Sequence, residues 1–462
     1  MSAAVPWRSK LRAPYLILAV FGLAVLMAAC APEVEEDPIA DDGVDDVVAD
    51  DDDDVADDDD VADDGDVTID LWFCRDDFVP GDNLEPFVEE TGINVNIDVI
   101  PCEQTVADFS RAFAAGTEPD GVLLGDDQLG PLAGAGVLMD LGEQTEAFRS
   151  EEPEVADALF ESAFLAGEYQ GTQYGWAWVQ AFPFYVWNKE IFEEAGLDPE
   201  SPPETWDDVI EIARQTGWDS DLGYNGFTQD FSRNQGCHVH HIKIFQSMGG
   251  EIAEDGGPEF DSPAGIEWIE FYQTMAGEGL INPESLGWDS GDKRASFIGG
   301  RASQGMLHSN VIVTVNEELD YPDQFSVTQL PRSADPDRAD DYVEVSRMYP
   351  YVVSANSEHA DEVAMAMRYM SQHDVMGEIH ARYVNALSPE VFEDEEYSGH
   401  LPWFADNSES IGEMVSYPQT EHQLDIWEIC LDAKQDALHN PDKDPQEIVS
   451  EAQARVDEVL GR

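Results

Sequence analysis

The chain has 462 residues, more than one hydrophobic core usually organises, so its length predicts two lobes or domains. Hydrophobic residues make up 42% of the chain and aromatic residues 10%. Its net charge of −77 is extreme, and it is still −57 without the 20 acidic residues between Glu33 and Asp66. Such a surface repels nucleic acid and anionic lipid headgroups, so we expect neither as a partner. The charge favours adaptation to a saline medium, where counterions screen the self-repulsion of a compact chain. The alternative is a generally acidic secreted protein.

Residues 1–29 have the organisation of a signal peptide. A basic start is followed by an apolar stretch of 14 residues, Leu16 to Ala29, which is too short for a comfortable membrane-spanning helix and typical of an export signal. Cys30 comes directly after two alanines and resembles the cysteine of a bacterial lipobox. We therefore expect lipid on Cys30 and attachment to the outer face of the cytoplasmic membrane. The alternative is an ordinary cleavage site with a chance cysteine. The basic residues are Arg8, Lys10 and Arg12.

Residues 30–66 are dominated by aspartate and contain few apolar side chains. They cannot bury enough apolar surface to fold, and their like charges extend the segment. We expect an acidic tether between the lipidated cysteine and the folded part. A calcium loop at Asp50–Asp54 is the alternative, but this run lacks the glycine turn and the spaced ligands of such loops.

The folded pattern begins at Val67. Hydrophobic periodicity predicts strands at 67–73, 93–99 and 121–124, with helices between them that end at Gly92 and Gly116. This alternation predicts right-handed crossovers and a parallel sheet. Ligands bind beyond the carboxyl ends of the strands in such sheets. The predicted ligand-facing segments are therefore Cys74–Asp77, Pro101–Glu103 and Gly125–Gln128.

Helical patterns dominate the rest of the chain. We expect one helix from Trp187 to Glu194 and another that Thr205 caps. Further helices are expected over 264–276, over 358–371 and in the last 18 residues, where apolar residues recur every four positions. The mixture of strands and helices predicts an α/β fold, and the sequence contains no repeat of fixed period.

Several short segments between Val67 and Leu460 occur in the same order as similar segments of a known protein family. They are Ile69–Trp72, Thr91–Val95, Ala114–Asp120, Gly134–Leu141, Val186–Phe192 followed by Ala195–Pro199 and Thr205–Asp207, and Gly300–Ala302. In this order they resemble the extracellular solute-binding proteins of ABC importers, in particular the carbohydrate-binding branch that includes maltose-binding protein.

The resemblance implies a two-lobed, periplasmic-binding-protein-like fold (type II), with a ligand cleft between lobes that close like a hinge. It implies a first lobe from residues 67–178 and 349–385 and a second lobe from 179–348 and 386–462. The chain would cross between lobes near Trp178, Tyr349 and Asn385. It also implies a monomeric substrate-binding protein without cofactor or catalysis, which captures a sugar or oligosaccharide outside the cell and delivers it to the membrane permease.

Sugar binding needs flat aromatic faces for the C–H side of the ring and planar polar groups for the hydroxyls. Side chains near the predicted strand ends, crossovers and motifs supply both. For each aromatic residue the alternative is packing in the core, and for each acid it is a solvated surface. The candidate ligand-binding residues are Trp72, Arg75, Asp76, Asp126, Asp127, Trp176, Trp178, Asp230, Arg233, Trp288, Asn310, Tyr349 and Trp403.

Other ligands and functions stay open as alternatives. A polyol is one; a sugar phosphate is disfavoured, because the chain is acidic and the strand ends supply few basic residues. The run Cys237–His241 holds transition-metal ligands and, as a strand, would place His238 and His240 on one face, but it lacks a second cysteine pair. A secreted glycosidase would need two carboxylates, which arise by chance among 99 acidic residues, and no common catalytic motif is present.

Four cysteines remain once Cys30 carries lipid, and an even number in an exported protein predicts two disulfides with three possible pairings. Cys74 follows the first predicted strand and Cys102 the second, so parallel neighbouring strands would bring them within disulfide reach. Elimination then pairs Cys237 with Cys430. The alternative is that some thiols are buried and reduced.

Overall fold

The computed structural model describes residues 67–233, 237–339, 346–383, 385–407 and 418–462, without the side chains of 237–239. These residues belong to one compact unit, Asp63–Arg462. The expected signal peptide, Cys30 and acidic tether lie outside the described residues. Within the described ranges, no helix is both long and apolar enough to cross a membrane.

The first lobe is built on a five-stranded sheet with the order β2-β1-β3-β10-β6. β1 pairs in parallel with β2 and β3, as the predicted crossovers require, whereas β10 runs antiparallel to β3 and β6. The carboxyl ends of the three parallel strands therefore meet at one edge of the sheet. The strands are β1 Thr68–Phe73, β2 Asn94–Val99, β3 Gly121–Leu123, β6 Gly175–Ala181 and β10 Arg347–Val353.

Helices α1 (Glu85–Thr91) and α2 (Thr105–Ala115) connect the parallel strands. Each ends at a glycine with left-handed backbone, Gly92 at φ 72° and Gly116 at φ 67°, a conformation that glycine adopts without a steric penalty. Phe87 of α1 and Phe109 of α2 are buried. The two glycines that the sequence predicts as helix ends, Gly92 and Gly116, therefore do end α1 and α2.

The second lobe is built on an antiparallel sheet with the order β8-β7-β9, formed by Pro183–Asn188 (β7), Gln304–His308 (β8) and Phe325–Thr328 (β9). Phe182 alone separates β6 of the first sheet from β7 of the second. The helix predicted to open at Trp187 begins at Lys189 instead, and Trp187 lies in β7. Asn188 caps this helix, because its side-chain oxygen accepts a hydrogen bond from the backbone N–H of Ile191 at 3.1 Å.

The segment Cys237–Ser247 is helix α9, so the strand considered for the Cys-His run is wrong. Every residue from His240 to Ser247 is buried, and in a helix residues three or four apart share a face, not residues two apart. Alternation therefore does not place His238 and His240 on one face. The predicted helices at 264–276, at 358–371 and at the C-terminus are confirmed as α10, α14 and α21.

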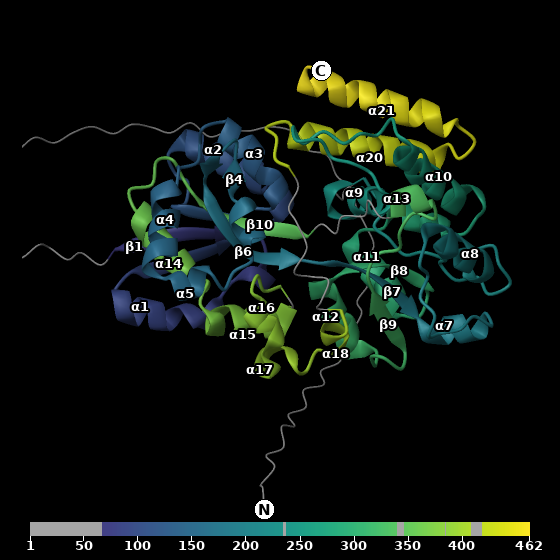
Figure 1. Ribbon diagram of the computed structural model, residues 1–462, viewed down its shortest axis with the longest axis horizontal. Coiled ribbons are helices and arrows are strands. Elements are labelled where there is room, and N and C mark those ends of the chain that lie inside the picture. Colours follow the sequence, from purple (N-terminus) through teal and green to yellow (C-terminus); the bar gives the residue numbers. More distant parts are fainter. Residues whose placement is uncertain (1–66, 234–236, 340–345, 384, 408–417) are drawn as a thin grey trace, which may run out of the picture. The chain divides into compact units, whose positions relative to one another are not determined.

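The remaining elements surround the two sheets (Figure 1). The helices are α3 Asp126–Gly134, α4 Gly142–Glu151, α5 Pro153–Ala156, α6 Glu161–Leu165, α7 Lys189–Glu194, α8 Trp206–Thr216, α10 Pro263–Gly277, α11 Ser290–Ile298, α12 Ser309–Glu318, α13 Pro336–Ala339, α14 Ala360–Met370, α15 His373–Tyr383, α16 Pro389–Glu393, α17 Glu395–Ser398, α18 Pro402–Ala405, α20 Gln423–His439 and α21 Pro445–Leu460. A short hairpin is formed by β4 Glu168–Tyr169 and β5 Thr172–Gln173.

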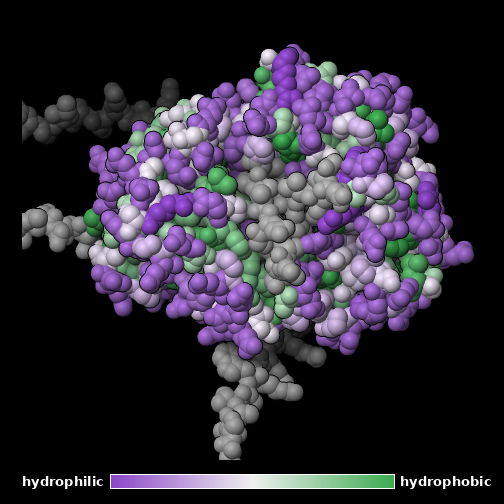
Figure 2. All heavy atoms as spheres, in the orientation of Figure 1, coloured by the Kyte–Doolittle hydropathy of each residue, from purple (hydrophilic) through white to green (hydrophobic). Residues whose placement is uncertain are grey.

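The buried cores show where the chain passes between the lobes. Ala386 and Tyr397 still belong to the core beneath the first sheet, whereas Leu401 and Trp403 pack with Phe182 in the core of the second. The core that the chain packs in thus changes between Tyr397 and Leu401, and the third passage near Asn385 stays a prediction. Helices α10, α20 and α21 pack together in the second lobe. The face of the molecule that Figure 2 shows is mainly hydrophilic.

Candidate functional site

A cavity of about 650 Å³ lies between the two lobes. On the first-lobe side it is lined by the segments that follow β1, β2 and β3, which are the strand ends that the sequence predicts to face a ligand. On the second-lobe side it is lined by α9, α11, α12 and α20. The first-lobe lining residues are Cys74, Arg75, Pro101, Cys102, Glu103, Asp127, Gln128, Ala181, Arg347 and Tyr349.

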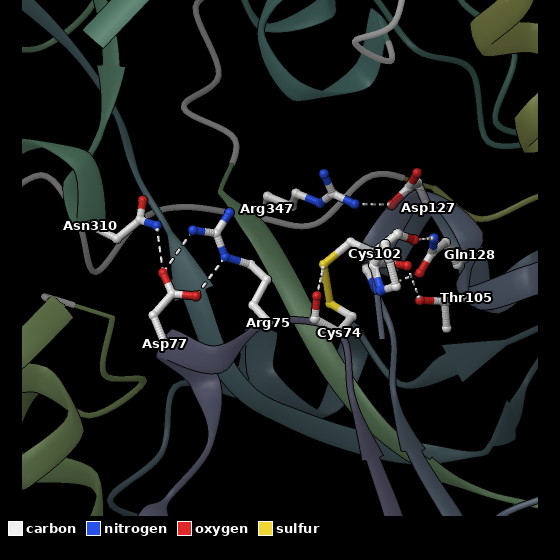
Figure 3. Close-up of a disulfide and its surroundings, with 11 residues drawn as sticks. Cys74, Arg75, Asp77, Cys102, Thr105, Asp127, Gln128, Asn310 and Arg347 are labelled. Carbon is white, nitrogen blue, oxygen red and sulfur yellow. Dashed lines mark hydrogen bonds and ion pairs between the residues drawn. A yellow bond between two sulfur atoms is a disulfide. The ribbon is translucent and has the colours of Figure 1, made fainter. Parts of the chain in front are cut away.

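A disulfide joins Cys74 to Cys102 across the ends of β1 and β2, with their Cα atoms 4.4 Å apart (Figure 3). This is the pair that the adjacency of the two strands predicts. Gln128 Nε2 donates to the carbonyl of Cys102 at 2.7 Å and so ties the start of α3 to the same rim. Cys430 is disulfide-bonded as well. The side chain of Cys237 lies outside the described residues, and its pairing with Cys430 remains a prediction.

Arg75 and Asp77 form a two-pronged pair at the rim of the first lobe (Figure 3). The Nε and Nη2 atoms of Arg75 donate to the two carboxylate oxygens at 2.6 and 2.7 Å. Asn310, at the start of α12 in the second lobe, donates from Nδ2 to Asp77 Oδ2 at 3.2 Å. One carboxylate therefore connects the two walls of the cavity.

A second arginine–carboxylate pair lies deeper in the first lobe. Arg347 Nη2 donates to Asp127 Oδ1 at 3.0 Å, and the Arg347 guanidinium carbon is 5.1 Å from the centre of the Tyr349 ring. Asp126 lies behind this pair and accepts the backbone N–H of Met348 at 3.3 Å. Charge-assisted pairs of this kind hold planar donors and acceptors in fixed directions.

The wall of the second lobe contains a buried network of ionisable side chains. Asp230 Oδ1 lies 2.7 Å from His240 Nδ1 and 3.5 Å from Lys293 Nζ, and Lys293 Nζ lies 2.9 Å from His240 Nε2. His240 Nε2 is in turn 3.1 Å from His308 Nδ1, and Lys243 Nζ is 3.3 Å from His308 Nε2. The network runs from α9 through β8 to α11, and His240, Lys293 and His308 reach the cavity.

Burial and neighbouring charges set the protonation of this network. Burial alone would raise the pKa of Asp230, but His240 and Lys293 hold that pKa well below its ordinary value. Burial lowers the pKa of His240 to about 4 and that of Lys243 to about 7. At neutral pH, Asp230 is therefore ionised and His240 is neutral.

The third side of the cavity is formed by α20. Arg233 donates to the carboxylates of Glu428 and Asp432 on this helix, at 3.0 Å for Glu428. Trp427 of α20 and Tyr349 of β10 are the indole and phenol rings that line the cavity in the described part of the chain. The site thus combines two aromatic rings with several fixed arginine–carboxylate pairs.

A protein-family model, bacterial extracellular solute-binding protein, matches residues 76–376, well over half of the chain. The chain is a bacterial extracellular solute-binding protein. The family description names solute binding, as the resemblance implied.

Two curated relatives cover parts of the same chain. A probable amino-acid ABC transporter periplasmic-binding protein from Sinorhizobium fredii is 33% identical over 124 residues, 27% of this chain and 28% of the relative. An sn-glycerol-3-phosphate-binding periplasmic protein from Yersinia pseudotuberculosis is 25% identical over 232 residues, 48% of this chain and 52% of the relative. The solute-binding protein therefore spans about half, or less, of the length of these relatives.

A solved structure covers more of the chain. The ABC transporter solute-binding protein from Thermotoga lettingae bound with α-D-tagatose is 20% identical and superimposes with a TM-score of 0.71, over 86% of this chain and 100% of that one. The likeness confirms the predicted α/β, two-lobed fold.

Three tryptophans predicted to contact the solute lie in the core instead. Trp176, Trp178 and Trp403 are each at most 2% exposed and do not line the cavity. Trp178 Nε1 donates to the carbonyl of Phe78 at 2.8 Å. All seven residues of β6, which carries Trp176 and Trp178, are buried. Nearness to a crossover therefore did not place these rings in the cleft.

Five other candidates also lie off the cavity. Asp126 and Asp230 are fully buried behind its walls. Trp72 is half-buried and packs edge-on against a phenylalanine of α2, Asp76 is exposed, and Trp288 is half-buried. The candidates that the structure does bring to the cavity are Arg75, Asp127, Arg233, Asn310 and Tyr349.

Most of the cavity's cations were not among the residues predicted from the sequence. Lys293, Arg294 and Arg347 line it, and they come from segments far from the first three strands. A signal existed for α11: Asp289 and Asp292 form a capping box that marks the helix start and orients the residues after it. The predicted strand ends themselves supply one basic residue, Arg75, and the other cations reach the cavity from segments that the prediction did not consider.

Proposed function

We propose that this solute-binding protein captures a small polyhydroxylated solute, a sugar or a related polyol, for an ABC importer. The cavity between the lobes carries this proposal, because its arginine–carboxylate pairs suit hydroxyl groups and its Tyr349 and Trp427 rings suit the C–H face of a sugar. Two relatives support it: one is bound with tagatose, and the other is named for binding sn-glycerol-3-phosphate. Delivery to a membrane permease follows from the importer role.

Capture is coupled to lobe closure in this proposal. A solute that contacts both walls binds the closed arrangement better than an open one and shifts the population toward it. The link from Asn310 to Asp77 already joins side chains of the two lobes. The permease would engage the closed protein, which we expect to act as a monomer.

Attachment to the membrane is a further part of the proposal. A lipidated Cys30 would hold the protein at the outer face of the cytoplasmic membrane, with the acidic segment 31–66 as its spacer. We expect Cys30→Ala to move the protein from the membrane fraction to the soluble fraction, as measured by fractionation and immunoblotting. The neighbouring variant Ala31→Ser should stay in the membrane fraction. Equal membrane association of Cys30→Ala and wild type would refute lipidation at this residue.

The solute class is tested by a thermal-shift screen of monosaccharides, oligosaccharides and polyols at high salt. A solute that binds only the folded state at a hundredfold excess over its Kd stabilises that state by about 2.7 kcal/mol, so the melting temperature should rise. Chromatography after the incubation should recover the solute unchanged. Conversion of the solute above the buffer rate would contradict a binding function.

A matched pair of asparagine variants shows whether the effect arises in the cavity. Asn310→Ala removes an amide that lines the cavity, and we expect it to weaken the binding of the best solute about five- to tenfold. Asn356→Ala removes an exposed amide that also donates to one carboxylate, Glu118, and should leave the affinity unchanged. Equal affinities of the two variants would place the binding site elsewhere.

A further inference from the structure

The charge of the cavity is opposite to that of the chain. The whole sequence has 22 Lys and Arg against 99 Asp and Glu, yet five of those cations line this one cavity together with three acids. In the whole chain, by contrast, acids outnumber Lys and Arg 99 to 22. The cations are Arg75, Arg233, Lys293, Arg294 and Arg347, and the acids are Glu103, Asp127 and Glu428.

Three helices also begin at the cavity. It is lined by Asp127 and Gln128 in the first turn of α3, by Ser290 and Gly291 in the first turn of α11, and by Asn310 and Val311 in the first turn of α12. The first backbone N–H groups of a helix have no partner within the helix, and the helix dipole makes this end positive. At α3 and α11 this potential is offset by carboxylates, Asp126 and Asp127 in the first helix and Asp289 and Asp292 in the second. Helix α12 has no acid in its first turn and no side-chain cap, so its start adds positive potential to the cavity.

The two walls differ in how far their cations are neutralised. On the first lobe, Arg75 is bonded to Asp77 and Arg347 to Asp127. On the second lobe, Arg233 is bonded to Glu428 and Asp432, and Lys293 lies 3.5 Å from Asp230. Arg294 of α11, which also lines the cavity, makes no hydrogen bond or ion pair within the described part of the chain. The positive charge left over is thus that of Arg294.

An arginine without a counter-charge beside other cations has an unfavourable electrostatic free energy, and a neutral sugar does not improve it. A negatively charged group held at the start of α12 does, because Arg294 and the free N–H groups of α12 are donors for its oxygens. The paired arginines of the first lobe remain for hydroxyl groups. The cavity therefore has one wall suited to a hydroxylated body and one suited to an anion.

We infer that the solute carries a compact anionic group, a phosphate ester or a carboxylate, on its polyhydroxylated body. This inference rests on the proposed function and specifies its solute class. The anionic group lies against the second-lobe wall at Arg294 and the start of α12, and the body extends toward Arg75, Arg347 and Tyr349.

Isothermal titration calorimetry with matched probes at one fixed salt concentration tests the inference. The probes are glucose, glucose 6-phosphate and glucuronate, together with glycerol, sn-glycerol 3-phosphate and inorganic phosphate. We expect a charged probe to bind at least tenfold more tightly than its neutral counterpart and more tightly than inorganic phosphate. A gain limited to the phosphate esters identifies phosphate as the group, whereas a gain for glucuronate identifies carboxylate.

A variant pair locates the anion. Arg294→Gln should weaken the charged probe about tenfold and leave the neutral probe unchanged, and Arg294→Lys should retain part of the affinity. The control is Arg382→Gln, an exposed arginine of α15 away from the cavity whose ion pair to Glu378 is 3.6 Å long. This control should bind as the wild type does. Melting temperatures without solute establish that each variant is folded.

The outcomes separate the inference from the function on which it rests. Neutral probes that bind as tightly as the charged ones, or an Arg294→Gln variant that weakens both equally, would overturn the anionic assignment alone. Failure of every sugar, polyol and charged derivative to bind would overturn the proposed function and the inference with it.

Discussion

We expect Trp176→Ala to lower the free energy of unfolding by about 3–5 kcal/mol, because it leaves a large hole in a packed core. The Trp176 ring is 1% exposed and stacks on Phe148 with 5.0 Å between ring centres, and its Nε1 donates to Ser371 Oγ at 3.1 Å. The solute affinity of the variant that remains folded should not change. Urea unfolding followed by circular dichroism, at one fixed salt concentration, measures the loss.

Trp218→Ala is the matched control for this substitution. Its side chain is 42% exposed, so its loss should change the unfolding free energy by no more than about 0.5 kcal/mol. If Trp176→Ala kept wild-type stability but bound the solute more weakly, Trp176 would instead contact the solute, as the sequence predicted.

We expect Asp230→Asn to lower the free energy of unfolding by about 3–5 kcal/mol at pH 7, because Lys293 would be left buried without its carboxylate. Asp230 is fully buried, accepts a hydrogen bond from Ser290 Oγ at 3.0 Å and lies close to His240 and Lys293. Urea unfolding of variant and wild type at pH 7 measures the difference. Asp442→Asn, an exposed carboxylate of the C-terminal region, should leave stability unchanged.

The pH dependence provides a second check on Asp230. Since the folded protein holds the pKa of Asp230 well below its ordinary value, the group stabilises the fold above about pH 4, the pKa of an aspartate in the unfolded chain. That contribution is lost as the pH falls from about 4 toward the folded-state pKa. The difference between wild type and Asp230→Asn should therefore shrink below about pH 4. A difference that stays constant down to pH 2 would rule out this charge as its source.

The fold was predictable from local signals that are strong in this sequence. The strand–helix–strand pattern of residues 67–124 is punctuated by Gly92 and Gly116, both of which end helices in the left-handed conformation. The prediction was wrong where a strand and a helix share apolar residues: Trp187 fits either pattern, and pairing with β8 and β9 places it in a strand. Tertiary pairing is not visible in a single sequence.

The position of the site was predictable, but many of its residues were not. The ends of β1, β2 and β3 reach the cavity because parallel strands end at one edge. The local sequence around an aromatic residue near a crossover does not decide whether its ring faces the cleft or the core. In this structure Trp176 and Trp178 face the core. Arg294 and Arg347 come from helix and strand positions that only the folded arrangement brings together.

The charge reversal between the surface and the cavity has a consequence for the speed of capture. An anion approaching through dilute buffer meets the field of a molecule with a net charge of −77 before it meets the cations inside. Salt screens the distant field, which fades beyond about 10 Å at 0.1 M, more strongly than contacts within a partly enclosed cavity. The association rate constant should therefore increase with ionic strength, the reverse of ordinary electrostatic steering. Such a receptor would then bind its solute fastest at high salt concentration.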